Sequence, residues 1–266
     1  MQTKAFSYLF SISYFGARYK GWAIQKGQPT IQGKLERVLR FVLGHDDFTL
    51  LGGSRTDSGV SCKQGYFQLF LSDKNDFAQE TISAINENLG GEIQIQFMGP
   101  VRRDFNLIKA SKRKVYRYFF TDTSDTHALH AAWLQLVFEK LDLGKMNEAA
   151  KAFVGKHDFR AFCTPSHTKT DFEREISRCQ ILLADEIPYK NLADPVYYLE
   201  VVGTGFLHHQ VRKMMRAIWY VGSGQWDLSE IENRLKRPSE DWEKIPPAPA
   251  TGLVLWEVKI DGEKCD

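Results

Sequence analysis

The pattern of apolar and polar residues over the first hundred positions predicts two helices interleaved with four strands. Strands are recognised by alternation and helices by apolar residues three and four positions apart. Pro29-Thr30 and Gly44 mark the start and end of the first helix, and Gly90-Gly91 the end of the second. The expected elements are a strand at 5–14, a helix at 31–43, strands near 48–53 and 65–72, a helix at 78–88 and a strand at 93–98. This β-α-β-β-α-β order is that of the ferredoxin-like, or split βαβ, fold.

The rest of the chain repeats this plan loosely. We expect strands at 115–121, 176–184 and 197–202, and helices at 145–154, 210–221 and 228–236. We place the domain boundary in a basic segment, so that residues 1–108 and 109–266 form two α/β halves. The fold class is therefore α+β, and two ferredoxin-like halves with their sheets joined into one antiparallel sheet would leave a central cleft.

Composition excludes several classes of protein. Hydrophobic residues make up 43% and charged residues 26% of the chain, as in ordinary globular proteins. No apolar run approaches the ~18 residues that a membrane-spanning helix needs, and the apolar N-terminal segment is interrupted by polar residues like a strand rather than a signal peptide. The four cysteines are scattered without metal-ligand spacing. We therefore expect a cytoplasmic protein with no membrane association and no metal site.

Net charge is too small to indicate a nucleic-acid partner, because 35 Lys and Arg residues face 33 Asp and Glu residues. Basic residues nevertheless gather in two places. The first cluster is Arg102, Arg103, Lys109, Lys112, Arg113, Lys114 and Arg117, and the second is His208, His209, Arg212, Lys213 and Arg216. Such clusters suit a polyanion, although charge alone favours an ordinary solvated surface.

A turn after the expected strand at 48–53 carries the clearest candidate for chemistry. It reads Arg55-Thr56-Asp57-Ser58-Gly59, and Gly59 can adopt a positive φ that lets a large ligand approach the backbone. An aspartate on such a turn is well placed to face a cleft. Turn chemistry alone favours a simpler interpretation, in which Asp57 only accepts hydrogen bonds from backbone N–H groups.

Eight segments favour a functional role for Asp57 over the simpler interpretation, because they follow one another in the order of a known family. They are residues 14–22 with Gln25, Thr30-Ile31-Gln32 with Leu35-Glu36, Arg55-Thr56-Asp57 with Gly59-Val60, residues 86–89, Tyr116-Arg117-Tyr118, residues 155–159 with Phe162, residues 206–212 and residues 248–253. In these segments the chain resembles the tRNA pseudouridine synthase A family along nearly its whole length. The resemblance implies the pseudouridine synthase fold and the isomerisation of uridine to pseudouridine in tRNA, without a cofactor. It also implies action in the anticodon stem-loop, just 3′ of the anticodon, by a homodimer in which one tRNA touches both subunits.

The same resemblance assigns roles to individual residues. Asp57 attacks the nucleoside, and Arg212 is the cation that keeps this carboxylate ionised where water is excluded. Tyr116 packs on the uracil ring, and Leu253 forms the apolar wall on its other face. Arg55, two residues before Asp57, is placed either to fill the space that the flipped base leaves or to hold the phosphate of the flipped nucleotide. The RNA backbone is expected to follow a set of basic residues. This set is Lys109, Lys112, Arg113, Lys114, His208 and His209.

The chain departs from the usual family sequence at several positions. Ser61 replaces a histidine, Ile108 an arginine and Arg216 a helix glycine, and these positions are plausible RNA contacts. The departures bear on the choice of the target uridine more than on the reaction. Alternatives are a catalytically inactive tRNA-binding or RNA-chaperone relative, and a synthase acting on another RNA position. An RNA hydrolase is a weaker idea, since the sequence shows no metal-carboxylate cluster.

Overall fold

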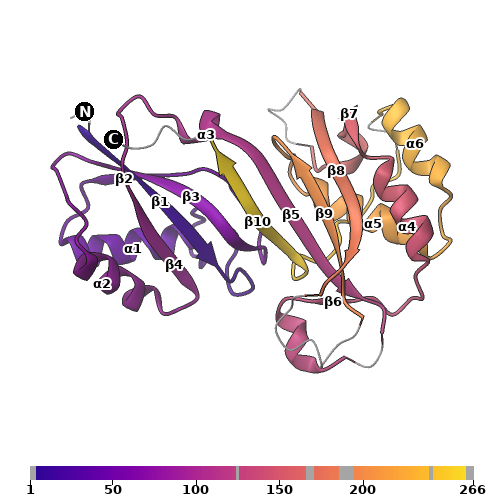
Figure 1. The fold of residues 1–266 in the computed structure, drawn as a ribbon, viewed down its shortest axis with the longest axis horizontal. Coiled ribbons are helices and arrows are strands. Elements are labelled where there is room, and N and C mark those ends of the chain that lie inside the picture. The colour runs from indigo at the N-terminus through magenta and orange to yellow at the C-terminus, as the bar shows by residue number, and fades with distance from the viewer. Residues whose placement is uncertain (1–3, 124–125, 166–170, 186–194, 240–241, 262–266) are drawn as a thin grey trace. The chain divides into compact units, whose positions relative to one another are not determined.

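The chain folds into two compact units (Figure 1). The computed structural model describes residues 4–123, 126–165, 171–185, 195–239 and 242–261. Unit 1 comprises the chain up to Lys112 and again from Leu255 onward, and unit 2 comprises Arg113–Val254. The division therefore differs from the single boundary between residues 108 and 109 that the sequence predicts, because the chain returns to unit 1 after Val254.

Unit 1 contains the predicted β-α-β-β-α-β order. Its elements are β1 (Phe6–Tyr14), α1 (Ile31–Leu43), β2 (Phe48–Gly52), β3 (Ser61–Leu71), α2 (Gln79–Leu89), β4 (Ile93–Pro100), the short α3 (Leu107–Ala110) and most of β10 (Leu253–Ile260). The neighbouring strands β4, β1, β3 and β2 pair antiparallel in that order. This is the strand order of the ferredoxin-like fold, so this part of the prediction is confirmed.

Aromatic side chains fill the core of unit 1. Phe10 lies opposite Phe67 and Phe97 in the strand registers, and the Phe10 and Phe67 rings stack with centroids 4.9 Å apart. Phe77 meets Phe10 edge-on at 5.0 Å. Helices α1 and α2 pack against each other on one side of the strands (Figure 1), so the sheet has one apolar, helix-covered face and one polar face.

The helix ends follow the signals seen in the sequence. The Thr30 hydroxyl accepts a hydrogen bond from the Gly33 N–H at 3.2 Å and caps α1. Gly44 and Gly90 both adopt left-handed conformations, with φ of 77° and 76°, and end α1 and α2.

Asn86 of α2 closes the outer edge of β4. Its side-chain amide donates to the Ile95 carbonyl oxygen at 3.0 Å, and its amide oxygen accepts from the Ile95 N–H at 2.8 Å. Ile95 faces Ile12 of β1 on the inner side. The side chain thus satisfies the two backbone groups that an edge strand leaves unpaired.

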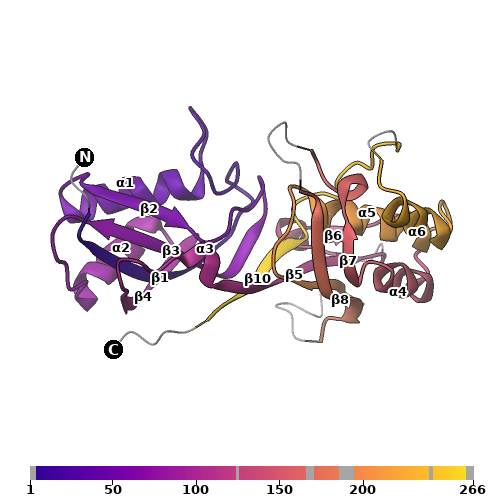
Figure 2. The ribbon, with the colours of Figure 1, turned by 90° about the horizontal axis from the view of Figure 1, so that it is seen from above.

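Unit 2 is also an α+β unit built on antiparallel strands. Its elements are β5 (Ser111–Thr121, entered from unit 1), a 3-10 helix (Ala128–Ala132), β6 (Gln135–Leu136), α4 (Leu143–Lys151), β7 (Gly155–Asp158), a second 3-10 helix (Arg160–Phe162), β8 (Glu173–Leu183), β9 (Tyr197–Gly203), α5 (Gln210–Gly222) and α6 (Leu228–Lys236). The strand order is β5-β9-β8-β7, antiparallel throughout, and β6 adds a short parallel pairing to β5. Helix α4 packs against α5 and α6 (Figure 2). The helices predicted near 145–154, 210–221 and 228–236 are confirmed within a few residues.

A buried ion pair joins neighbouring strands in unit 2. Arg117 of β5 donates from Nε and Nη2 to Glu200 of β9, at 3.1 and 3.0 Å, and Arg178 of β8 reaches the same carboxylate at 3.2 Å. Glu200 is only 6% exposed, so its charge depends on these partners. Arg117 belongs to the first basic cluster of the sequence, and its side chain bonds to Glu200 of the neighbouring strand.

Strand β10 was missed by the sequence interpretation, which treated Leu253 only as part of a site. In the described residues, no helix has the length and apolar character needed to cross a membrane. Cys62, Cys163 and Cys179 are buried free thiols, and Cys265 lies outside the described residues.

Removal of the Asn86 amide tests the edge contact. We expect Asn86→Ala to lower the free energy of unfolding by about 1–3 kcal/mol, because the Ile95 N–H and carbonyl lose their partners. Asn88→Ala is the matched control, since the Asn88 amide bonds only to the Ala84 carbonyl on an exposed helix surface. Urea denaturation measures both changes, and equal losses in the two variants would contradict the proposed role of Asn86.

Candidate functional site

The loop at residues 53–60 joins β2 to β3 in unit 1 and carries Asp57. Thr56 and Val60 are buried, Asp57 is half-buried, and Ser58 is exposed. The Asp57 carbonyl oxygen accepts a hydrogen bond from the Val60 N–H at 3.2 Å, and Gly59 adopts a φ of 82°. Buried residues on both sides of the turn thus anchor the aspartate between them.

Residues 14–22, the first of the family-like segments, hold this loop by hydrogen bonds. The Trp22 N–H donates to the Thr56 carbonyl and the Gly59 N–H to the Tyr19 carbonyl, both at 3.1 Å. The Tyr14 hydroxyl lies 2.8 Å from the Thr56 hydroxyl. The backbone on each side of Asp57 is therefore fixed by a distant part of the chain.

Two glycines make this close approach feasible. A Cβ atom at Gly21, where φ is 91°, would lie 2.8 Å from the Thr56 carbonyl oxygen. A Cβ at Gly16 would lie 2.0 Å from the Val60 carbonyl oxygen. Both distances are too short for a side chain, so the glycines are required by contact with the Asp57 loop.

Ser61, one of the departures from the family pattern, has a local role. Its hydroxyl oxygen accepts a hydrogen bond from the Gly16 N–H at 2.9 Å. The substitution thus ties the start of β3 to the same glycine that packs on Val60.

Tyr19, whose carbonyl bonds to Gly59 of the loop, is itself held by a hydrogen bond of its side chain. It is 6% exposed, and its hydroxyl donates to the Glu92 carboxylate at 3.0 Å. Burial, together with this hydrogen bond, raises the pKa of Tyr19 to about 12. The phenol therefore stays neutral and bound at physiological pH.

The remaining predicted residues of unit 1 lie at its surface. Arg55 is exposed beside the loop, and Lys109 and Lys112 are exposed around α3. Ile108 is 58% exposed, which is unusual for an isoleucine. These positions are accessible to a large ligand.

In unit 2, Tyr116 of β5 is held by an aromatic neighbour. Tyr116 is 8% exposed, and Phe206 meets it edge-on with ring centroids 5.0 Å apart. Phe206 begins the family-like segment 206–212. Arg113 and Lys114 precede Tyr116 on the strand and are both half-buried, and burial lowers the pKa of Lys114.

The start of α5 is fastened to the segment that follows the second 3-10 helix. The Thr164 N–H donates to the His208 carbonyl at 2.9 Å, and the Thr164 hydroxyl lies 2.9 Å from His209 Nδ1. His209 takes a left-handed φ of 61°, and its ring stacks on that of His208. Lys213, only 7% exposed, donates to the Cys163 carbonyl at 2.8 Å, and burial lowers its pKa.

Arg212 is bound to the segment 248–253 at both its backbone and its side chain. Its Nε donates to the Ala248 carbonyl at 2.6 Å, and its own carbonyl accepts from the Ala248 N–H at 3.0 Å. The next residue, Pro249, accepts the Tyr118 hydroxyl at 2.7 Å. The segment that contains Leu253 therefore positions Arg212.

Leu253 and Gly252 close this segment against β5. The Phe119 N–H donates to the Gly252 carbonyl at 2.8 Å, and a Cβ at Gly252 would lie 2.5 Å from the Phe119 carbonyl oxygen. Leu253 is 4% exposed.

Arg216 lies one turn after Arg212 on α5, so the two share a helix face. Its guanidinium carbon is 5.3 Å from the centroid of the Trp219 ring, and its Nε has no hydrogen-bond partner among the described residues. Burial raises the pKa of Tyr118 above its usual value, and the charges of Arg212 and Arg216 oppose that shift.

The structure thus describes Asp57 and Arg55 within unit 1, and Tyr116, Arg212, His208, His209 and Leu253 within unit 2. Sequence interpretation missed Phe206, Thr164 and Lys213 as supports for these groups. Phe206 and Lys213 lie within or beside the family-like segment 206–212, but the residues that they contact, Tyr116 and Cys163, are distant in sequence.

Comparison with known proteins gives consistent matches. The family described as tRNA pseudouridine synthase matches residues 149–261. The tRNA pseudouridine synthase A 2 of Bacillus cereus is 32% identical over 255 residues, covering 96% of this chain and 99% of the relative. The tRNA pseudouridine synthase A of Pseudothermotoga lettingae is 30% identical over 253 residues, covering 93% and 96%. A chain in the crystal structure of a Cbf5-Nop10-Gar1 complex is 11% identical with a TM-score of 0.33, and the match covers 79% of this chain and 54% of that one.

The contact between Gly21 and the Asp57 loop can be tested with a matched pair of glycines. Gly21 and Gly27 both have positive φ, but a Cβ at Gly27 would meet nothing within 4 Å. We expect Gly27→Ala to cost about 1 kcal/mol of unfolding free energy from backbone strain alone. Gly21→Ala adds a clash with the Thr56 carbonyl and is expected to cost about 2 kcal/mol more. Urea denaturation of both variants decides the point, and similar losses would show that the close approach is unimportant.

Proposed function

Because the chain belongs to the tRNA pseudouridine synthase A family, isomerases that convert uridine to pseudouridine in tRNA, we propose that Asp57 is its catalytic carboxylate. The observation that carries this proposal is the setting of Asp57. It is half-buried in a turn whose flanking residues are fixed by the segment 14–22. A nucleophile must be held in a reactive geometry, and this turn limits the motion of the aspartate.

The chemistry requires such a group. Isomerisation breaks the bond between C1′ and N1 and forms one between C1′ and C5. N1 gains a proton and C5 loses one, so the reaction needs no redox partner and, we propose, no cofactor. The carboxylate can trap the electron-poor C1′, add to C6 of the ring, or abstract a ribose proton while a glycal forms.

We assign the other groups by their chemistry. Arg212 supplies the positive charge that pairs with the Asp57 carboxylate, and the bond from its Nε to the Ala248 carbonyl holds its side chain in place. Tyr116 packs on the uracil, with Leu253 as an apolar wall. Arg55, exposed beside the nucleophile, holds the flipped nucleotide.

The binding of tRNA as a whole is assigned to charged and polar residues at the surface. We propose that the backbone follows Lys109, Lys112, Arg113, Lys114, His208 and His209, which makes affinity sensitive to salt. We further propose action in the anticodon stem-loop, a homodimeric enzyme and a cytoplasmic location, the compartment in which reduced thiols such as the buried Cys62 are ordinary.

Substitution of the nucleophile is the direct test. We expect Asp57→Ala to lose at least about 10⁴-fold in rate, because it removes the group through which every route proceeds. Pseudouridine in treated tRNA is mapped by carbodiimide adducts and primer stops. Asp73→Ala, on an exposed loop of unit 1, is the matched control and should retain activity. Pseudouridine formation by the Asp57→Ala variant would refute the catalytic role of Asp57. If neither the wild type nor the variant forms pseudouridine, the result favours an inactive tRNA-binding relative.

A second variant tests the cation. We expect Arg212→Lys to fold normally but to lose about 10²-fold or more in kcat, since an ammonium cannot reproduce the planar guanidinium. Arg178→Lys is the control, because Arg178 is a half-exposed partner of Glu200. Single-turnover kinetics measure both, and near-normal turnover by the Arg212 variant would contradict the assignment.

A further inference from the structure

The polar face of the unit 1 sheet forms a second surface, made by the side chains that alternate with the core residues. Side chains alternate across a strand, so the buried Phe10, Ile12 and Tyr14 of β1 face one way and Ser11 and Ser13 the other. The same alternation on β4 exposes Gln94, Gln96 and Met98.

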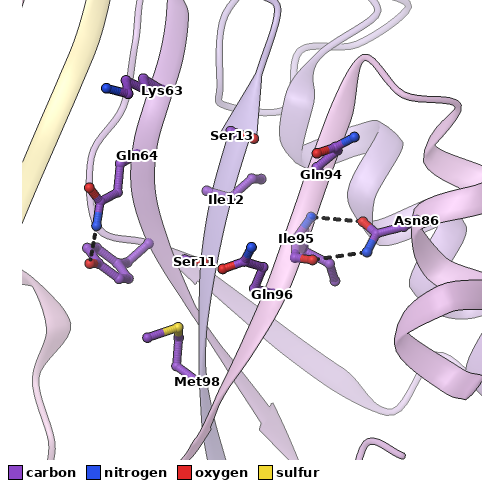
Figure 3. A pocket seen from close by; sticks show the side chains of 11 residues that line it. Ser11, Ile12, Ser13, Lys63, Gln64, Asn86, Gln94, Ile95, Gln96 and Met98 are labelled. Carbon is purple, nitrogen blue, oxygen red and sulfur yellow. Dashed lines mark hydrogen bonds between the residues drawn. The ribbon is translucent and has the colours of Figure 1, made fainter. Parts of the chain in front are cut away.

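This face is hollowed. Side chains from β1, β3 and β4 surround a cavity of about 460 Å³ (Figure 3). That volume lies within the ~300–1,000 Å³ typical of ligand pockets. Asn86, at its margin, is already bonded to the backbone of Ile95 (Figure 3).

The chemistry of the surface is specific. Glutamine and serine side chains both donate and accept hydrogen bonds. Gln64 donates to the Tyr66 hydroxyl at 2.8 Å, and Lys63 places its ammonium 3.9 Å from the centroid of the Trp256 ring. None of the eleven described residues that line the cavity is an aspartate or glutamate. A surface with many neutral hydrogen-bonding groups, one cation and no anion suits a polar ligand of negative charge.

Single-stranded RNA is such a ligand, because its unstacked bases and 2′-hydroxyl groups offer donors and acceptors along an anionic backbone. RNA-recognition modules also present a four-stranded antiparallel sheet to unpaired nucleotides, although they rely more on aromatic stacking. This likeness is one of architecture only.

We propose that this sheet face binds unpaired nucleotides of the tRNA other than the uridine that reacts, through Ser11, Gln94 and Gln96. The proposal rests on the proposed function, since tRNA is the substrate. The face contributes affinity and selection of the RNA, and it takes no part in the bond changes. Its loss therefore raises KM and leaves kcat unchanged.

Charge placed on the face tests this assignment. We expect the double variant Gln94→Glu, Gln96→Glu to raise the Kd and KM for unmodified tRNA about tenfold, because two carboxylates repel phosphates and cannot donate hydrogen bonds. Gln94→Ala, Gln96→Ala separates the loss of hydrogen bonds from repulsion and should raise Kd about threefold or more. Gln79→Glu, exposed on α2, is the matched control.

The outcomes separate this inference from the proposed function. Unchanged Kd and KM in the glutamate variant, with normal pseudouridine formation, would overturn the RNA-binding face alone. If the wild type forms no pseudouridine, the proposed function fails, while tRNA binding measured by fluorescence anisotropy still reports on the face.

A photo-crosslinker identifies the occupant directly. Met98→p-benzoylphenylalanine, at a side chain that is 49% exposed, should crosslink to tRNA. The same probe at Phe41, on α1, should not. A crosslink from position 98 to a second protein chain would assign the face to contact between copies and overturn the proposal. A glutamate variant that sediments as a smaller species than the wild type would do the same.

Discussion

The close approach of two backbone segments in unit 1 determines the position of the turn that carries Asp57. Residues 16–21 and 56–60 touch at Gly16 and Gly21, where a side chain would collide with carbonyl oxygens. Hydrogen bonds from Trp22 and Gly59 cross the same contact. The pairing of β1 with β3 also shifts register between Ile12 and Tyr14, just before this contact. Such an irregularity re-aims the chain at a strand end, so the position of the Asp57 turn depends on the first strand of the protein.

In unit 2, Arg212 is likewise held by segments that are distant in sequence. Arg212 is fixed by reciprocal bonds with Ala248, and the adjoining segment is held to β5 through Pro249 and Gly252. Lys213 and Thr164 fasten the start of α5 from another side. In both units the side chain to which we assign a catalytic role is a single residue, whereas the residues that fix it are spread over the sequence. This is a physical reason why eight short segments, each weak alone, identify the family together.

The sequence was sufficient where structure depends on near neighbours. Thr30, Gly44 and Gly90 act within a few residues, so the helix ends could be predicted, and alternation identified most strands. It was insufficient where a partner is distant. Arg117 counted as part of a basic cluster, whereas its partner Glu200 lies 83 residues further along the chain, and the bond from the Gly16 N–H to Ser61 spans 45 residues. Asn86 matched a family segment, but its bonds to Ile95 depend on which strand lies at the sheet edge. Strand β10 was missed because attention went to Leu253 as a possible wall of the site.

The return of the chain to unit 1 sets when this unit can finish folding during synthesis on the ribosome. Residues from Leu255 onward belong to unit 1. Trp256 lies under Lys63, and the Asp261 N–H donates to the Ala110 carbonyl at 3.0 Å. Domains usually fold as they emerge, N-terminal first. Here the N-terminal unit is completed by residues that are made after the whole of unit 2, so the nascent chain must carry an unfinished unit 1 through the synthesis of unit 2. Translation to the end of β10 is therefore a condition for the complete fold of the unit that bears Asp57.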